Sequence, residues 1–187
     1  MVWKNDQVTE KETLEILELA RECLEISGDF VEMGCYKGDT SLLLAEILQR
    51  DAIRKKLWIY DSFEGLPEKS AEDESVLGVN FKGGELVVTK REVKERFLRA
   101  GFPVPVIKKA WFSDLTSEDL PEEIAFAFLD GDFYESLRDS LRLVVPKMNE
   151  KGILVVHDYT NPALPGVKKA VDEWRNAKNI TCKLVLL

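Results

Sequence analysis

Residues 29–41 of the chain read DFVEMGCYKGDTS, an apolar run followed by a turn that contains two glycines. Phe30, Val31 and Met33 predict a short strand, and the segment 41–48 after the turn predicts a helix. Such a glycine turn lets the backbone approach a ligand closely, and the start of a helix offers free N–H groups to an anion. The stretch therefore indicates a strand, a turn and a helix in direct succession.

The same alternation continues along the rest of the chain. Further strands are expected at 56–60, 104–107, 124–129, 153–156 and 180–187, and further helices between Thr9 and Gly28, at 90–100, at 134–145 and after Pro165. Near-continuous apolar strands are typical of a parallel sheet that is covered on both faces. We therefore expect an α/β fold with a three-layer, doubly wound, mostly parallel sheet.

The length of 187 residues predicts a single domain over 1–187, because about 100–200 residues usually form one domain. One segment, 65–84, is long, acidic and without a clear period. A long irregular stretch inside a compact domain is usually either a functional loop or a linker, and we expect a lid-like surface excursion there rather than a domain boundary.

Charge and composition exclude several kinds of partner. Twenty-six Lys and Arg against thirty-four Asp and Glu leave a net charge of −8, the wrong sign for nucleic acid. No apolar run approaches the roughly 18 residues that a membrane-spanning helix needs, so no membrane partner is expected. The first residues show no secretory signal and three cysteines cannot pair completely, so we expect a cytoplasmic protein with reduced thiols.

Open parallel sheets bind ligands beyond the carboxyl ends of their strands, so the residues that follow each apolar run are the candidates for a site. Asp61 follows the second expected strand, where a carboxylate can accept both hydroxyls of a ribose. The dinucleotide pattern GxGxxG is missing, which favours a nucleoside over a pyrophosphate. Trp111 and Phe112 also lie on an expected ligand loop.

Two acidic clusters follow neighbouring strands, Asp130 with Asp132 and His157 with Asp158. Like charges so close together are unfavourable unless a positive charge lies between them, which predicts a divalent cation. Asp130 and Asp158 offer the oxygen ligands that Mg²⁺ prefers, whereas His157 as a ligand favours Mn²⁺, Fe²⁺ or Zn²⁺.

Structural interpretations stand beside these functional ones. The two glycines could serve only a tight turn, and Asp61 could cap a helix or turn. One of Asp130 and Asp132 could be only the N-cap of the helix that follows them. His157 could be a ligand, a base or a residue without a role in the site, because a lone histidine is often structural.

Five longer stretches carry a family resemblance: EMGCYKGDTS (32–41), YDSFEGLP (60–67), AWFSDL (110–115), FLDGDFYESLRDSL (128–141) and GILVVHDYTNPALPGVKKAVDEW (152–174). They resemble class I S-adenosylmethionine-dependent methyltransferases of the macrocin O-methyltransferase and novobiocin sugar O-methyltransferase family. DSFEGLP and LDGD are more specific than the glycine turn. The resemblance implies a Rossmann-like methyltransferase fold, and the end of this chain holds sequence for only one of the family's last two strands.

By this resemblance the cofactor is S-adenosyl-L-methionine. The turn 34–41 would hold its methionine end, Asp61 its ribose, and Ser113 would lie near its adenine. The full set of expected cofactor-binding residues is Glu32, Gly34, Tyr36, Gly38, Thr40, Ser41, Asp61, Ser62, Ser113 and Asp130.

The resemblance also implies catalytic and metal-binding roles. Family members carry Asp at the position of Asp130 and two consecutive Asp after the fifth strand as magnesium ligands; here His157 replaces the first of that pair and Asp158 is the second. The family's general base falls on Asp132. The expected catalytic residues are therefore Asp132 and His157, and the expected ligands of a Mg²⁺ or Mn²⁺ ion are Asp130, His157 and Asp158.

The implied function is metal-assisted methyl transfer from S-adenosylmethionine to a hydroxyl of a sugar or other small polyol. The alternative is a non-catalytic protein of the same fold that binds S-adenosylmethionine or S-adenosylhomocysteine. The apolar edge 184–187 could pair with another chain, which predicts a homo-oligomer.

Overall fold

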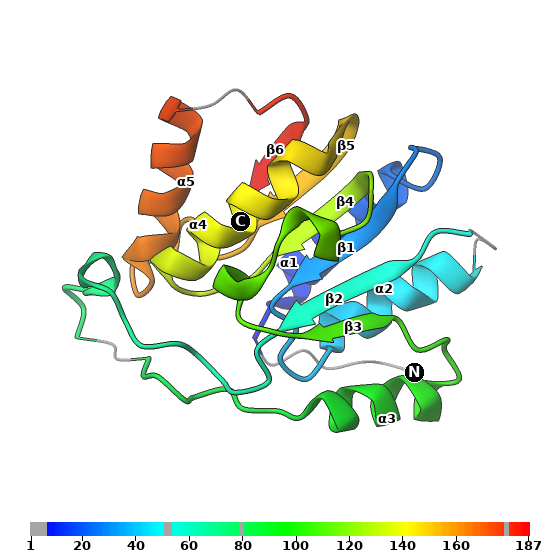
Figure 1. Ribbon diagram of the computed structural model, residues 1–187, viewed down its shortest axis with the longest axis horizontal. Helices are drawn as coiled ribbons and strands as arrows, with labels where there is room; N and C mark the ends of the chain where they lie inside the picture. Colours follow the sequence, from blue (N-terminus) through cyan, green and yellow to red (C-terminus); the bar gives the residue numbers. More distant parts are fainter. Residues whose placement is uncertain (1–6, 51–53, 79–80, 178–179) are drawn as a thin grey trace.

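The computed structural model describes residues 7–50, 54–78, 81–177 and 180–187. Within these residues one sheet of six strands has the order β3-β2-β1-β4-β5-β6, and every neighbouring pair is parallel (Figure 1). The strands are β1 (Asp29–Met33), β2 (Leu57–Asp61), β3 (Val106–Lys109), β4 (Ile124–Leu129), β5 (Met148–Val156) and β6 (Lys183–Leu186). The expected doubly wound fold with a single final strand is confirmed.

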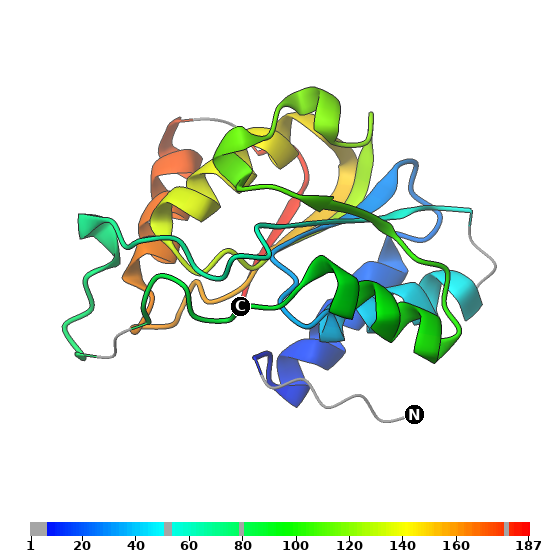
Figure 2. The same cartoon turned by 60° about the horizontal axis from the view of Figure 1, so that its bottom comes forward.

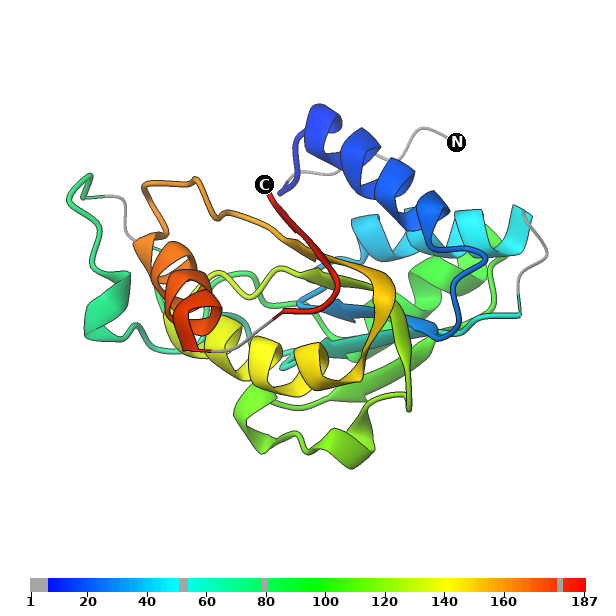
Figure 3. The same cartoon turned by 90° about the horizontal axis from the view of Figure 1, so that it is seen from above.

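Helices cover both faces of the sheet, as Figure 3 shows from above. On one face lie α1 (Glu10–Glu22), α2 (Asp39–Arg50) and α3 (Lys90–Ala100), and on the other lie α4 (Tyr134–Val144) and α5 (Pro165–Ala177). Successive side chains of a strand point to opposite faces, so Phe126 and Phe128 of β4 join the first layer, whereas Ala127 and Leu129 join the second. All six residues of β4 are buried, which explains its unbroken apolar sequence.

Local signals set most of the element ends. The side chains of Thr9 and Glu12 form a capping box at the start of α1, and Thr89 and Glu92 form the same arrangement at the start of α3. β5 begins at Met148, five residues before the expected strand at 153–156. The apolar run did not reveal this first part because residues 149–151 are polar and partly or fully exposed.

The segment 65–84 is tied to the body of the protein at several points. Its two ends are joined where the N–H of Leu66 donates to the carbonyl of Glu85 (2.8 Å) and the N–H of Gly84 donates to the carbonyl of Leu66 (2.8 Å). Further along, buried Asp73 accepts a hydrogen bond from the backbone N–H of Tyr134 (2.7 Å) and so caps α4. The short 3₁₀ helix η1 (Ala71–Asp73) within this segment packs against α5, as Figures 1 and 2 show.

The structure also bears on the expectations about membrane-spanning helices and cysteines, within the described residues. None of its helices has the length and apolar character that crossing a membrane requires. Its three cysteines, Cys23, Cys35 and Cys182, are buried free thiols.

Candidate active site

A cleft of about 880 Å³, including the part open to solvent, lies at the carboxyl ends of β1, β2, β4 and β5. Its walls come from the loops that follow these strands, from Ala110, Trp111 and Phe112 after β3, and from Gln7 and Val8 before α1. This is the edge of an open parallel sheet where ligands bind.

Backbone strain is concentrated around this cleft. Among the residues that the structure describes, five non-glycine residues have a left-handed backbone conformation, with φ between 45° and 61°, and four of them line the cleft: Tyr36, Leu86, Asp132 and Asp158. The fifth, Phe63, follows cleft residue Ser62. Such conformations cost of order 1–3 kcal/mol each and persist where a functional site needs them.

Gly34 joins the two halves of the cleft. Its φ is +89°, and a Cβ atom there would lie 2.0 Å from the carbonyl oxygen of Asp130. The missing side chain is therefore required by the contact between the turn after β1 and the end of β4. The alternative that this glycine serves only the turn is thus sufficient to explain its presence, although Gly34 also lines the cleft.

Asp61, the last residue of β2, fixes the shape of the glycine turn. Its Oδ2 accepts hydrogen bonds from the backbone N–H groups of Cys35 (2.9 Å) and Tyr36 (3.1 Å). Its Oδ1 accepts from the N–H of Phe63 (2.7 Å). A carboxylate has about four acceptor positions, so capacity for a ligand remains on a group that lines the cleft.

Glu32 lies at the base of the cleft and is buried, with 1% of its surface exposed. Burial raises the pKa of its carboxyl to about 8, and the nearby charges of Asp130 and Asp61 add to this effect. The hydroxyl of Ser41 donates to Oε2 of Glu32 and partly opposes the shift. Ser41 thus acts on Glu32 and does not itself line the cleft.

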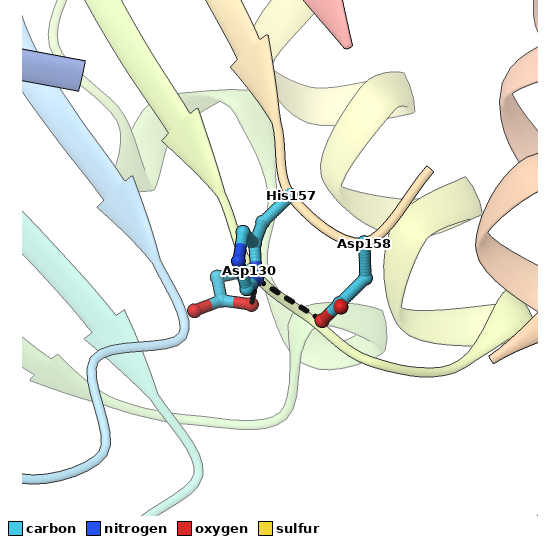
Figure 4. A group of neighbouring side chains, drawn as sticks. All are labelled: Asp130, His157 and Asp158. Carbon is cyan, nitrogen blue, oxygen red and sulfur yellow. Dashed lines mark hydrogen bonds and ion pairs between the residues drawn. The ribbon is translucent and has the colours of Figure 1, made fainter. Parts of the chain in front are cut away.

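On the other side of the cleft, His157 lies between two carboxylates (Figure 4). Its Nδ1 is 3.0 Å from Oδ1 of Asp130 and 3.0 Å from Oδ2 of Asp158. Burial of the imidazole lowers the pKa of His157, but the charges and hydrogen bonds of the two aspartates outweigh it and raise that pKa to about 11. A protonated His157 therefore offsets one of the two negative charges of Asp130 and Asp158.

Asp158 is stabilised as a carboxylate. Burial raises its pKa, but His157 and the amide of Asn161, which donates to Oδ1 at 2.8 Å, outweigh burial and lower it.

The carboxyl of Asp132 shows the opposite shift: burial and then the charges of Asp130 and Asp158 raise its pKa well above the usual value. A carboxyl with a raised pKa in a cleft is a candidate proton acceptor.

The three expected metal ligands lie together. Asp130, His157 and Asp158 can each supply one ligand atom, and these atoms lie within 4.8 Å of one another. The two N–O separations of 3.0 Å match the spacing of adjacent ligands on an octahedral ion with bonds of about 2.1 Å. Two carboxylates and one imidazole therefore fit a small divalent cation, provided that Nδ1 carries no proton.

Most of the expected site residues line the cleft, namely Glu32, Gly34, Tyr36, Thr40, Asp61, Ser62, Asp130, Asp132, His157 and Asp158. Gly38, Ser41 and Ser113 do not. Ser113 is exposed, and its hydroxyl is 3.4 Å from a carboxylate oxygen of the adjacent Asp114. Its neighbours Trp111 and Phe112, also on the expected ligand loop, line the cleft instead.

The sequence reasoning missed the contribution of the N-terminal segment. Gln7 and Val8 line the cleft, and Oε2 of Glu12 lies 3.8 Å from Nε2 of His157. The capping box of Thr9 and Glu12 marked the start of a helix, but no local signal indicated that this start lies at the cleft.

Comparison with known proteins agrees with the geometry. Residues 11–186 match the family described as macrocin O-methyltransferase (TylF). The chain belongs to this family. The match covers nearly the whole chain, and the family's members are O-methyltransferases, so the resemblance noted from the sequence motifs is confirmed.

Two curated relatives come from Streptomyces. Demethyldecarbamoylnovobiocin O-methyltransferase of Streptomyces niveus is 29% identical over 183 residues, which cover 91% of this chain and 69% of the relative. An 8-demethyl-8-(2,3-dimethoxy-alpha-L-rhamnosyl)-tetracenomycin-C 4'-O-methyltransferase of Streptomyces olivaceus is 29% identical over 162 residues. The matched residues cover 83% of this chain and 61% of that relative. The chain thus spans about two thirds of the length of these relatives.

Solved structures show the same fold. The O-methyltransferase NovP superposes with a TM-score of 0.78 at 28% identity, covering 89% of this chain and 72% of NovP. The calicheamicin methyltransferase CalS11 superposes with a TM-score of 0.72 at 19% identity, covering 91% of this chain and 72% of CalS11. At this identity the likeness supports the fold alone.

Proposed function

We propose that this protein transfers a methyl group from S-adenosylmethionine to a hydroxyl of a sugar or other small polyol, with the assistance of a divalent cation. The observation that carries the proposal is the convergence of two groups in one cleft. Asp61 and the glycine turn form one side, and Asp130, His157 and Asp158 form the other. The relatives that act on novobiocin and rhamnosyl-tetracenomycin precursors support a sugar-bearing acceptor.

The cofactor side fits a nucleoside. A cleft of about 880 Å³ lies within the usual range of about 300–1,000 Å³ for small-molecule sites. Asp61 would accept hydrogen bonds from the ribose hydroxyls, while the turn after β1 would hold the methionine end. Trp111 and Phe112 supply apolar surface for a base on the loop where Ser113 was expected to lie near the adenine.

The other side fits a cation and an acceptor. Asp130, His157 and Asp158 would hold Mg²⁺ or Mn²⁺, which when bound lowers the pKa of an acceptor hydroxyl and orients it. The imidazole nitrogen favours Mn²⁺ over Mg²⁺, because Mg²⁺ prefers oxygen ligands. His157 must first lose the proton on Nδ1, so cation binding should release a proton.

The chain's own residues then position the reactants and move a proton. Asp132 would accept the proton of the acceptor hydroxyl, because it lines the cleft and burial raises the pKa of its carboxyl, which makes the carboxylate a stronger base. Asp61 and the turn hold one reactant while the acidic side holds the other, and such positioning supplies much of the rate in a displacement reaction.

Calorimetry and mass spectrometry test this proposal. We expect S-adenosylhomocysteine to bind at sub-millimolar concentration. A panel of nucleotide sugars and glycosides should then contain an acceptor that gains 14 mass units, with activity lost in EDTA and restored by Mn²⁺. Absence of cofactor binding would overturn the proposal.

A specific observation favours the alternative of a non-catalytic binding protein. A protonated His157 already forms an ion pair with both Asp130 and Asp158, so each of these carboxylates has a cationic partner within the chain itself. Cofactor binding without methylation of any acceptor, in Mg²⁺, Mn²⁺, Co²⁺ or Zn²⁺, would support this alternative.

We also propose that copies of the chain associate through β6. Within the described residues β6 pairs with β5 alone, and its apolar residues are only partly buried. A free apolar edge is prone to pair with a strand of another chain. Sedimentation should show a dimer or larger species at micromolar concentration; a monomer contradicts the proposal.

A further inference from the structure

Glu12 approaches the acidic cluster from a distant part of the chain. It lies in the first turn of α1, and its Oε2 is 3.8 Å from Nε2 of His157. The opposite nitrogen of the same ring, Nδ1, faces Asp130 and Asp158. The imidazole therefore has two carboxylates at one nitrogen and a third carboxylate at the other.

Glu12 also has a structural role, and α3 provides a comparison for it. Oε2 of Glu12 accepts hydrogen bonds from the N–H (3.0 Å) and hydroxyl (2.6 Å) of Thr9. Glu92 forms the same two bonds with Thr89, at 2.8 and 2.6 Å. A glutamine can serve in a capping box as well as a glutamate, so capping does not require the negative charge.

The charge of Glu12 matters for the ring of His157. In metal sites, a histidine ligand usually presents its second ring nitrogen to a carboxylate, a backbone carbonyl or a water molecule, which fixes the orientation and tautomer of the ring. At 3.8 Å the contact with Glu12 is electrostatic and longer than a hydrogen bond. Once Nδ1 has lost its proton, a negative charge beside Nε2 favours a hydrogen on Nε2 and leaves Nδ1 free for a cation.

We propose that Glu12 is a positioning residue of the cation site, which acts across the His157 ring so that Nδ1 faces Asp130 and Asp158 as a ligand atom. This inference rests on the cation site of the proposed function. It also links the N-terminal segment to the chemistry, because Gln7 and Val8, just before α1, line the same cleft.

The test compares Glu12→Gln with the matched variant Glu92→Gln. Both substitutions keep a capping box and remove one negative charge, but Glu92 is fully exposed at the start of α3 and is not a lining residue of the cleft. Free Mn²⁺ is measured by electron paramagnetic resonance in titrations of untagged protein. We expect Glu12→Gln to weaken Mn²⁺ binding about tenfold or more, as loss of such a partner usually does, and Glu92→Gln to change it less than twofold.

A second readout uses the single histidine of the chain. With ¹⁵N-labelled histidine and diamagnetic Zn²⁺, the ring signals of the untagged protein come from His157 alone. We expect wild type to show the metal on Nδ1 and the hydrogen on Nε2, and Glu12→Gln to show a mixture or exchange broadening.

The outcomes are distinguishable. If wild type binds Mn²⁺ and Glu12→Gln binds it equally well with unchanged ring signals, the role of Glu12 is overturned and the cation site stands. If wild type binds S-adenosylhomocysteine but no Mn²⁺ or Zn²⁺, the cation site itself is wrong, and the role of Glu12 falls with it. Thermal unfolding of both variants checks that the capping boxes are kept.

Discussion

The two sides of the cleft are held in place by different forces. On the side of β1 and β2, the carboxylate of Asp61 accepts three backbone hydrogen bonds, which fix the glycine turn. On the side of β4 and β5, His157 is held by charge between Asp130 and Asp158. The first side therefore has a fixed shape, whereas the second depends on its protonation and on any bound cation.

The largest effect is expected where the two sides meet. In Gly34→Ala the new methyl group would lie 2.0 Å from the carbonyl oxygen of Asp130, at a φ of +89° that alanine rarely adopts. Separation of the turn from β4 should lower the free energy of unfolding by about 3 kcal/mol or more. Urea denaturation measures this change, and a loss below about 1 kcal/mol would show that the contact is easily relieved.

Asp61→Asn tests the side with the fixed shape. One carboxylate oxygen becomes an NH₂ group, which cannot accept the hydrogen bonds of the turn, and leaving buried donors unsatisfied costs about 1–3 kcal/mol. We expect binding of S-adenosylhomocysteine to weaken at least tenfold by calorimetry. Glu64→Gln, on the same loop but in an exposed ion pair with Lys109, is the control and should bind normally.

The charged side should respond to pH. The folded pKa of His157 is about 11 and its unfolded value is near 6.5, so its ion pairs stabilise the metal-free protein fully below about pH 6.5 and are lost as pH rises toward 11. Between pH 7 and 10, wild type should lose more unfolding free energy than His157→Gln. Parallel curves for the two proteins would contradict the ion-pair account.

The smallest effect concerns the segment 65–84. Asp73→Ala removes the cap of α4 and should cost about 1–2 kcal/mol of unfolding free energy, while Asp73→Asn, which keeps an acceptor, should cost less. Because Asp73 does not line the cleft, affinity for S-adenosylhomocysteine should change less than threefold. A large loss of affinity would show that this anchor also shapes the cofactor side.

Much of the fold followed from local patterns. β4 and α3 have the bounds that the apolar run 124–129 and the capping box at Thr89 predict. β5 was predicted too short because residues 149–151 near its start are polar, and an apolar run does not reveal the strand pairing of such residues.

The strand-end rule and the family motifs placed Asp61, Asp130, His157 and Asp158 at one edge of the sheet, and the structure brings them to one cleft. Ser113 was expected near the adenine because of its motif, but a short 3₁₀ turn directs its neighbours Trp111 and Phe112 to the cleft. The orientation of single side chains in such a turn depends on packing against α4 and cannot be derived from a motif.

The amino-acid sequence by itself was sufficient to establish the three layers, the succession of strands and helices along the chain, and the acidic residues at the strand ends. Periodicity, capping and strand ends are local properties of the chain, so they can be recognised without the tertiary structure. Three-dimensional packing alone placed Glu12 next to His157 and the carbonyl of Asp130 where a side chain at Gly34 would be. Those contacts join segments about 100 residues or more apart, and nothing in either segment specifies the other until the sheet is assembled.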